Sequence, residues 1–330
     1  MRTLITRSLR PGTDQGEIIM KKLKMTLGSI LAAVAIMAST SAFAAEPKEL
    51  RFGLLPAEDA IEMVKQFQGI ADHLGKTMGL PVKVWVSQSY NALIEAMGAG
   101  KLEVVYLGGG TYVAAKNAGL DVVPVVAAKT PISKTDKVGR TYYKSCIITR
   151  SDSGIKKLDD LKGKTFAFVT PTSTSGGVGP RFYLLKNGID PEKDFKNLLY
   201  AGKHDAVYLA VKNGKVDAGA IGDLYFPRWK SRGILNYDSY DEPNDALIGE
   251  SELYIIGCQK VPGTPMVTRK AFGKAFLDKL RAAFVSLPFG AVDTYRIWGP
   301  TLAFVPVTDA DYADLAEMKR MASEAKKKKK

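Results

Sequence analysis

The chain has 330 residues and a formal net charge of +13, and its last five residues are all lysines. This length is enough for two domains of ordinary size, each with its own core. The two cysteines and two histidines lack the spacing of a metal site, and no basic and aromatic pattern of a nucleic-acid-binding module is present. We therefore expect no cofactor, no metal and no nucleic-acid partner.

The N-terminal region is typical of an export signal. Lysines at positions 21, 22 and 24 precede an apolar run over 25–37, and Ala42, Phe43 and Ala44 supply the small residues of a cleavage site. We predict a signal peptide over 20–44 and interpret 1–19 as a mis-assigned translation start. No cysteine lies near the cleavage site, which favours a periplasmic protein without a lipid anchor.

Strands and helices alternate along the mature chain in two series. The first series has predicted strands over 50–56, 82–86 and 102–107 and predicted helices over 60–78, 91–97 and 111–117. The second has predicted helices over 158–161, after Gly176 and over 205–212, and predicted strands over 165–169, 197–200 and 216–221. Such alternation predicts an α/β fold with largely parallel sheets and helices on both faces.

Two β-rich segments, 146–150 and 253–257, flank the second series. We interpret them as chain crossings between two lobes, so that they form the hinge. The first lobe is then expected over 45–147 and 259–325 and the second over 148–258, with a disordered lysine tail at 326–330. Ligands of open α/β sheets bind outside the carboxyl ends of the strands, which here face the cleft between the lobes.

The run from Pro171 to Gly177 contains four hydroxyl side chains and two glycines, directly before a predicted helix. Hydroxyls donate hydrogen bonds, the first amides of a helix have no intrahelical partner, and the helix dipole favours negative charge at that end. We therefore predict that Ser173, Thr174 and Ser175 bind a tetrahedral oxyanion. The alternative is an ordinary N-cap beside a solvated loop.

An exported two-lobe α/β chain with this loop resembles the periplasmic phosphonate/phosphite-binding proteins of ABC importers (the PhnD type), which implies the type II periplasmic binding protein fold. The resemblance extends over about 48–320. Besides the loop and Pro180, it is carried by the segments SYNALIEAM at 89–97, YYKS at 142–145, AGKHDA at 201–206 and VPGTP at 261–265. It implies a monomeric periplasmic binding protein with an ABC permease as its partner and a phosphorus oxyanion or phosphonate as its ligand.

The resemblance assigns further ligand contacts to Tyr90, Tyr143 and His204. A tyrosine offers a flat apolar face and a hydroxyl that reaches a ligand oxygen. The alternatives are packed surface tyrosines and a structural histidine. We place His73 on the surface of its helix, and we expect Asp205 to cap the helix that follows it.

Two more positions bear on selectivity. Asp223 follows the predicted strand 216–221, and a carboxylate there accepts a proton from a P–OH group, unless it is simply a loop charge. In the family, an acidic residue of the second hinge loop helps to bind amine-bearing phosphonates, and this chain has Thr264 at that place. The departure favours phosphite, phosphate or a short alkylphosphonate over an aminoalkylphosphonate.

Several alternatives stay open. Cys146 and Cys258 either form a disulfide or, as thiolates, favour arsenite as the ligand. A sulfonate is a further alternative for the ligand. A membrane histidine kinase is an alternative to the permease as the partner. The glycines at 108–110 follow a predicted strand, but no Gly-Lys-Ser/Thr follows them, and we expect them to let the backbone approach the cleft or to form a turn. Because no catalytic motif is present, we predict a binding protein and not an enzyme.

Overall fold

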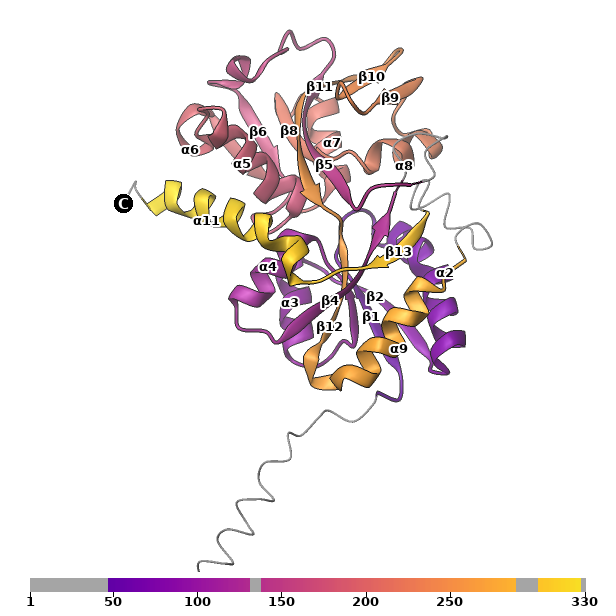
Figure 1. The fold of residues 1–330 in the computed structure, drawn as a ribbon. Helices are drawn as coiled ribbons and strands as arrows, with labels where there is room; N and C mark the ends of the chain where they lie inside the picture. Colours follow the sequence, from indigo (N-terminus) through magenta and orange to yellow (C-terminus); the bar gives the residue numbers. More distant parts are fainter. Residues whose placement is uncertain (1–46, 131–137, 289–301, 328–330) are drawn as a thin grey trace, which may run out of the picture. The chain divides into compact units, whose positions relative to one another are not determined.

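A computed structural model describes residues 47–130, 138–288 and 302–327 (Figure 1). Strands within these ranges form a six-stranded sheet, a five-stranded sheet and a two-stranded hairpin. Both large sheets belong to one compact unit, Ala45–Lys330. We call the part around the six-stranded sheet the first lobe and the part around the five-stranded sheet the second lobe. The predicted leader at 1–44 lies outside the described residues.

The first sheet has the strand order β13-β4-β12-β3-β1-β2. Its strands are β1 (Leu50–Leu54), β2 (Val82–Val86), β3 (Val104–Tyr106), β4 (Val122–Lys129), β12 (Pro265–Arg269) and β13 (Ala303–Pro306). Strand β1 runs parallel to β2 and β3, while β12 and β13 are antiparallel to their neighbours. The sequence did not lead us to expect β4, β12 or β13. Since β12 inserts between β3 and β4, the chain returns to the first sheet after building the second.

Helix α2 (Ala60–Met78) has the predicted bounds. It begins where the Asp59 carboxylate accepts hydrogen bonds from two first-turn amides, and it ends at Gly79, whose φ of 69° suits glycine. Its apolar stripe, which includes Phe67, Ile70 and Leu74, is buried. The other helices of this lobe are α3 (Tyr90–Gly98), α4 (Gly109–Asn117) and α9 (Gly273–Val285), and the 3₁₀ turns are Lys270–Phe272 and Asp309–Tyr312.

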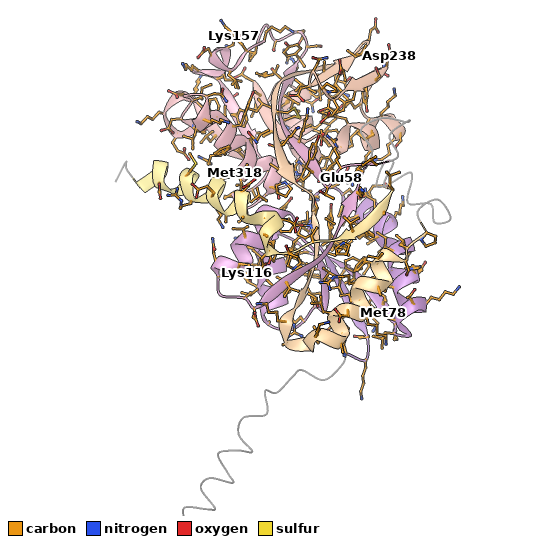
Figure 2. All side chains as sticks on the ribbon, viewed as in Figure 1. Glu58, Met78, Lys116, Lys157, Asp238 and Met318 are labelled. Carbon is orange, nitrogen blue, oxygen red and sulfur yellow. A yellow bond between two sulfur atoms is a disulfide. The ribbon has the colours of Figure 1, made fainter. Side chains whose placement is uncertain are left out.

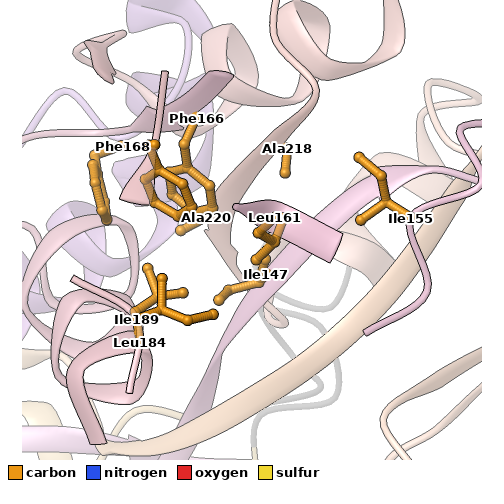
Figure 3. Packing of buried hydrophobic residues seen from close by; sticks show 10 residues of the cluster. Ile147, Ile155, Leu161, Phe166, Phe168, Leu184, Ile189, Ala218 and Ala220 are labelled. Atoms are coloured by element: carbon orange, nitrogen blue, oxygen red, sulfur yellow. The ribbon is translucent and has the colours of Figure 1, made fainter. Parts of the chain in front are cut away.

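The second sheet has the strand order β11-β5-β8-β6-β7. Its strands are β5 (Tyr142–Arg150), β6 (Thr165–Phe168), β7 (Asn197–Tyr200), β8 (Ala218–Gly222) and β11 (Leu253–Pro262). The hairpin is β9 (Ser239–Asp241) with β10 (Ala246–Ile248), and the helices are α5 (Gly179–Lys186), α6 (Pro191–Asp194), α7 (His204–Lys212) and α8 (Tyr225–Ser231). Figure 3 shows the core of this lobe, in which Phe166, Leu184 and Ile147 pack from β6, α5 and β5. The predicted fold class, two lobes with mostly parallel sheets and flanking helices, is confirmed.

Strands β5 and β11 are the two predicted crossings, and they pair antiparallel along their length. Cys146 lies directly opposite Cys258 in this pairing, and the two form a disulfide across 112 residues of sequence. The disulfide alternative is therefore confirmed. The interpretation of the two cysteines as thiolate ligands for arsenite is wrong, because a disulfide has no thiolate to offer.

Four local expectations need correction. Residues Leu158–Leu161 form a 3₁₀ turn and not an α-helix. Helix α7 begins at His204 with Lys203 at its N-cap, so Asp205 lies in the first turn, where its carboxylate accepts a hydrogen bond from the next amide, Ala206 N. His73 is half-buried, with its Nε2 2.9 Å from Ala283 O of α9. Helix α11 (Ala313–Lys327) includes the first two residues of the expected lysine tail.

None of the helices in the described ranges has both the length and the apolar character of a membrane span.

Candidate functional site

The hydroxyl loop lies beyond the carboxyl end of β6. The side chains of Ser173, Thr174 and Ser175 are buried, and the Ser173 hydroxyl accepts a hydrogen bond from Gly176 N at 3.2 Å. Ser173 thus caps a π-helical turn, Thr174–Val178, that leads into α5. A Cβ at Gly177 would lie 2.0 Å from Thr170 O, so only glycine allows this tight turn. The sequence anticipated the position of the loop but not its π-helical geometry.

The first turn of α4 faces this loop from the other lobe. Gly110 N donates a hydrogen bond to Thr174 Oγ1 at 2.9 Å. A Cβ at Gly108 would lie 2.8 Å from Thr174 Oγ1, and one at Gly110 would lie 2.8 Å from Thr172 O. Gly108 and Gly110 therefore let the backbone of α4 approach the hydroxyl loop. The amides of Gly110 and Gly176 donate to loop hydroxyls, and these hydroxyls can in turn donate to an anion.

The two predicted tyrosines lie against the loop. Tyr90, at the start of α3, lies next to Ser173, and Tyr143 of β5 lies next to Ser175 and Thr174. Both rings are buried. Burial raises the pKa of Tyr143 to about 12 and also raises the pKa of Tyr90. Both phenols are therefore neutral and able to donate hydrogen bonds at neutral pH.

Thr264 lies between β11 and β12, next to Tyr143 and to a second buried tyrosine, Tyr106. Tyr106 also lies next to Arg228 of α8. Sequence reasoning did not assign Tyr106 to the site. The signal was present, because Tyr106 lies near the carboxyl end of the predicted strand 102–107, and we expected the carboxyl ends of the strands to face the cleft.

His204 is the first residue of α7 and is 3 % exposed. Its ring stacks on Tyr225, with 4.2 Å between the ring centroids. Burial, assisted by the nearby Arg228 guanidinium, lowers the pKa of His204 to about 3, so the imidazole is neutral. Its Nδ1 has no hydrogen-bonding partner among the described residues. Such a buried polar atom is costly unless something else, such as a bound ligand, bonds to it.

Tyr225 and Arg228 were also missed. Both lie on α8, a helix of seven residues that contains Pro227. A segment this short carries no readable helical periodicity, so the sequence held no signal for it.

The Asp223 carboxylate is part of an ion network behind the loop. It accepts a hydrogen bond from Lys144 N at 2.9 Å and pairs with Arg140 Nη2 at 3.1 Å. Arg140 also pairs with Glu242 at 2.6 Å. Burial raises the pKa of Asp223, and Arg140 opposes this shift. It is the neighbouring Gly222 that meets the loop, since a Cβ there would lie 2.9 Å from Ser175 Oγ.

The structure therefore brings six of the predicted site residues close together, namely Tyr90, Tyr143, Ser173, Thr174, Ser175 and Thr264. His204 joins them through Tyr225, and Asp223 lies behind them in the ion network. A separate pocket of about 310 Å³ is lined by the crossing strands and α11, including Tyr142, Lys260 and Met318. None of the eight predicted site residues lines that pocket.

A family model described as "ABC transporter, phosphonate, periplasmic substrate-binding protein" matches residues 52–312. The chain belongs to this family. It is 27% identical over 287 residues to the "Phosphate-import protein PhnD" of Mycolicibacterium smegmatis, covering 81% of this chain and 83% of that protein. It is 24% identical over 281 residues to the "Phosphonates-binding periplasmic protein" of Escherichia coli, covering 84% and 77%.

Two solved structures share the fold. One is a binding protein component of an ABC phosphonate transporter from Pseudomonas aeruginosa, with a TM-score of 0.69, 23% identity and coverage of 85% of this chain and 88% of that chain. The other is PhnD1 from Prochlorococcus marinus in complex with methylphosphonate, with a TM-score of 0.68, 21% identity and coverage of 84% and 99%. The resemblance to PhnD-type binding proteins is thereby confirmed, and family members are substrate-binding components of transporters.

Proposed function

We propose that this protein captures phosphite, phosphate or a short alkylphosphonate between its two lobes and delivers it to an ABC permease. The observation that carries the proposal is the buried hydroxyl loop at 173–175, which faces the first turn of α4 and two neutral tyrosines. Charge-assisted hydrogen bonds from hydroxyls and backbone amides suit an oxyanion and need no cation in contact with it. The names of the two curated relatives support a phosphorus ligand.

Thr264 and the paired acidic residues around the site favour a ligand without an amine. Asp223 is paired with Arg140, and the fully buried Glu58 is paired with Arg232. Thr264 is neutral and lies next to two tyrosines. An ammonium group beside Thr264 would compete with these cations for a carboxylate, and an unpaired buried charge costs several kcal/mol. The half-buried Asp205, which has no ion-pair partner among the described residues, is the carboxylate that an amine-bearing ligand would have to reach.

A thermal-shift screen of the mature chain tests this proposal. The ligands are phosphite, hypophosphite, phosphate, methylphosphonate, 2-aminoethylphosphonate, arsenite and sulfate. A ligand at about 100 times its dissociation constant stabilises the folded state by about 2.7 kcal/mol. We expect shifts with phosphite, phosphate or methylphosphonate and a smaller one with 2-aminoethylphosphonate. A shift with sulfate or arsenite alone would contradict the proposal, and turnover of a phosphorus ester would contradict a purely binding role.

A further inference from the structure

Glu58 is a buried carboxylate that the proposed ligand site does not use. It lies in the loop between β1 and α2 of the first lobe, it is 0 % exposed, and Figure 2 labels it. Within its own lobe it accepts a hydrogen bond from Gln66 Nε2 at 3.1 Å. One such partner does not compensate the removal of a carboxylate from water.

The remaining donors come from α8 and the residue after it, in the second lobe. Trp229 Nε1 and Arg232 Nη1 each donate to Glu58 Oε1 at 2.9 Å, and Arg228 Nη1 lies 3.7 Å from Oε2. We call Glu58, Arg228, Trp229 and Arg232 the Glu58 cluster. Next to it, His204 N donates to Ala57 O at 2.9 Å, so the same first-lobe loop is held twice by the second lobe.

The cluster is connected to the ligand site through α8. The Trp229 ring stacks on Tyr225 with 5.5 Å between centroids, and Tyr225 stacks on His204. Arg228 also lies next to Tyr106 of the first lobe. The position of Tyr225, and its contact with His204, thus depend on whether α8 is docked on Glu58.

We infer that Glu58 is a positioning residue that stabilises the closed arrangement of the two lobes and thereby slows release of the ligand. When the lobes separate, the Glu58 carboxylate, the Trp229 indole and the Arg232 guanidinium are all rehydrated. A buried ion pair gains little net free energy over its solvated partners, so the cluster permits opening. It also disfavours partly closed geometries, in which a charge is buried without its partner. Removing one partner of a buried pair mainly raises the dissociation rate, here that of the ligand.

The test compares Glu58→Ala and Glu58→Gln with the wild type, using methylphosphonate as the probe. We expect the dissociation rate, followed by tryptophan fluorescence in stopped flow, to rise about 100-fold in Glu58→Ala and about 10-fold in Glu58→Gln. Association rates should change far less. The matched control is Glu103→Gln, because Glu103 is also a buried carboxylate but pairs with Arg51 inside the first lobe. The control should lower stability without changing the dissociation rate.

The kinetic readout depends on the proposed function, so a second readout needs no ligand. In ligand-free Glu58→Ala, closure would bury Arg232 and Trp229 without their carboxylate partner, so the variant should favour the open arrangement with or without ligand. Small-angle scattering of ligand-free Glu58→Ala should give a larger radius of gyration than the wild type. If methylphosphonate fails to bind the wild type, a short alkylphosphonate is ruled out as the ligand, and scattering alone decides about Glu58. An unchanged radius, or an unchanged dissociation rate where the probe binds, overturns the inference.

Discussion

The candidate site and the ion network behind it differ in the charge of their buried polar groups. Around the loop the groups are neutral, namely the hydroxyls at 173–175, the phenols of Tyr90 and Tyr143, and an imidazole whose pKa is lowered to about 3. Behind the loop the groups are charged and paired with one another. Neutral hydrogen-bond donors suit an anionic ligand that binds and dissociates. Paired ions suit residues whose positions stay the same whether or not the ligand is bound. The comparison predicts that substitutions in the network affect stability, and that substitutions in the loop affect binding.

The largest effect is expected from Arg140→Met, which leaves Asp223 and Glu242 buried without their shared cation. Removing one partner of a buried pair costs about 3–5 kcal/mol of unfolding free energy, measured by urea denaturation. The control is Arg150→Met, because Arg150 pairs with Asp152 at the surface. An exposed pair contributes at most about 1 kcal/mol. Equal losses in the two variants would mean that the network is no more important than a surface pair.

Removal of the disulfide should come next. The cross-link between Cys146 and Cys258 closes a segment that contains β6, β7 and β8. Such a cross-link restricts the unfolded chain and typically contributes about 2–4 kcal/mol. We expect this loss in the double variant Cys146→Ala, Cys258→Ala, measured by denaturant unfolding. Dithiothreitol should destabilise the wild type by a similar amount and leave the double variant unchanged; any other pattern would mean the cysteines are not linked in solution.

A smaller effect concerns pH and His204. Its pKa is about 3 in the folded protein, below the ordinary value of about 6.5. Below pH 6.5 the unfolded chain binds a proton that the folded chain does not, so stability falls as the pH drops from about 6.5 towards 3. One proton gives a slope of about 1.4 kcal/mol per pH unit, or about 2 kcal/mol between pH 6.5 and 5. His204→Gln should lack this part of the pH dependence, and parallel curves for the two proteins would contradict a buried neutral histidine.

The smallest effect is expected at Thr264, the neutral residue at the position where we expect a protein that binds amine-bearing phosphonates to have an acidic residue. Thr264→Asp should narrow the preference for methylphosphonate over 2-aminoethylphosphonate about 10-fold, equivalent to about 1.4 kcal/mol. The new carboxylate pairs with the ammonium group and repels phosphorus oxygens. Calorimetry with both ligands on both proteins measures the ratio. If the wild type already prefers the amine, then Thr264 is not the position that sets this selectivity.

The sequence predicted those parts of the molecule that depend on local chemistry. Helix α2 has a capping carboxylate, a regular apolar stripe and a terminal glycine, and its bounds were predicted to the residue. Strands β2 and β7 were also predicted with their observed bounds. The Ser-Thr-Ser-Gly run was recognised because consecutive hydroxyl residues and glycines before a helix are typical of an anion-binding loop.

The parts that the sequence missed are set by tertiary packing. Tyr225 reaches the site on α8, whose position depends on Glu58 of the other lobe. Strand β12 lies between β3 and β4 because the chain returns from the second lobe, which no local pattern encodes. The pairing of Asp223 with Arg140 depends likewise on residues 83 positions apart.

Calorimetric titration of methylphosphonate into the wild type and Ser175→Ala tests most directly whether the neutral loop binds the anion. Loss of one donor to a buried charged ligand should weaken binding by about 1.5–3 kcal/mol, or about 10- to 100-fold. The control Ser153→Ala removes a hydroxyl of the same lobe that bonds locally to Arg150 O, and it should bind as the wild type does. Wild-type affinity in Ser175→Ala would contradict the account and leave the loop with only its capping role.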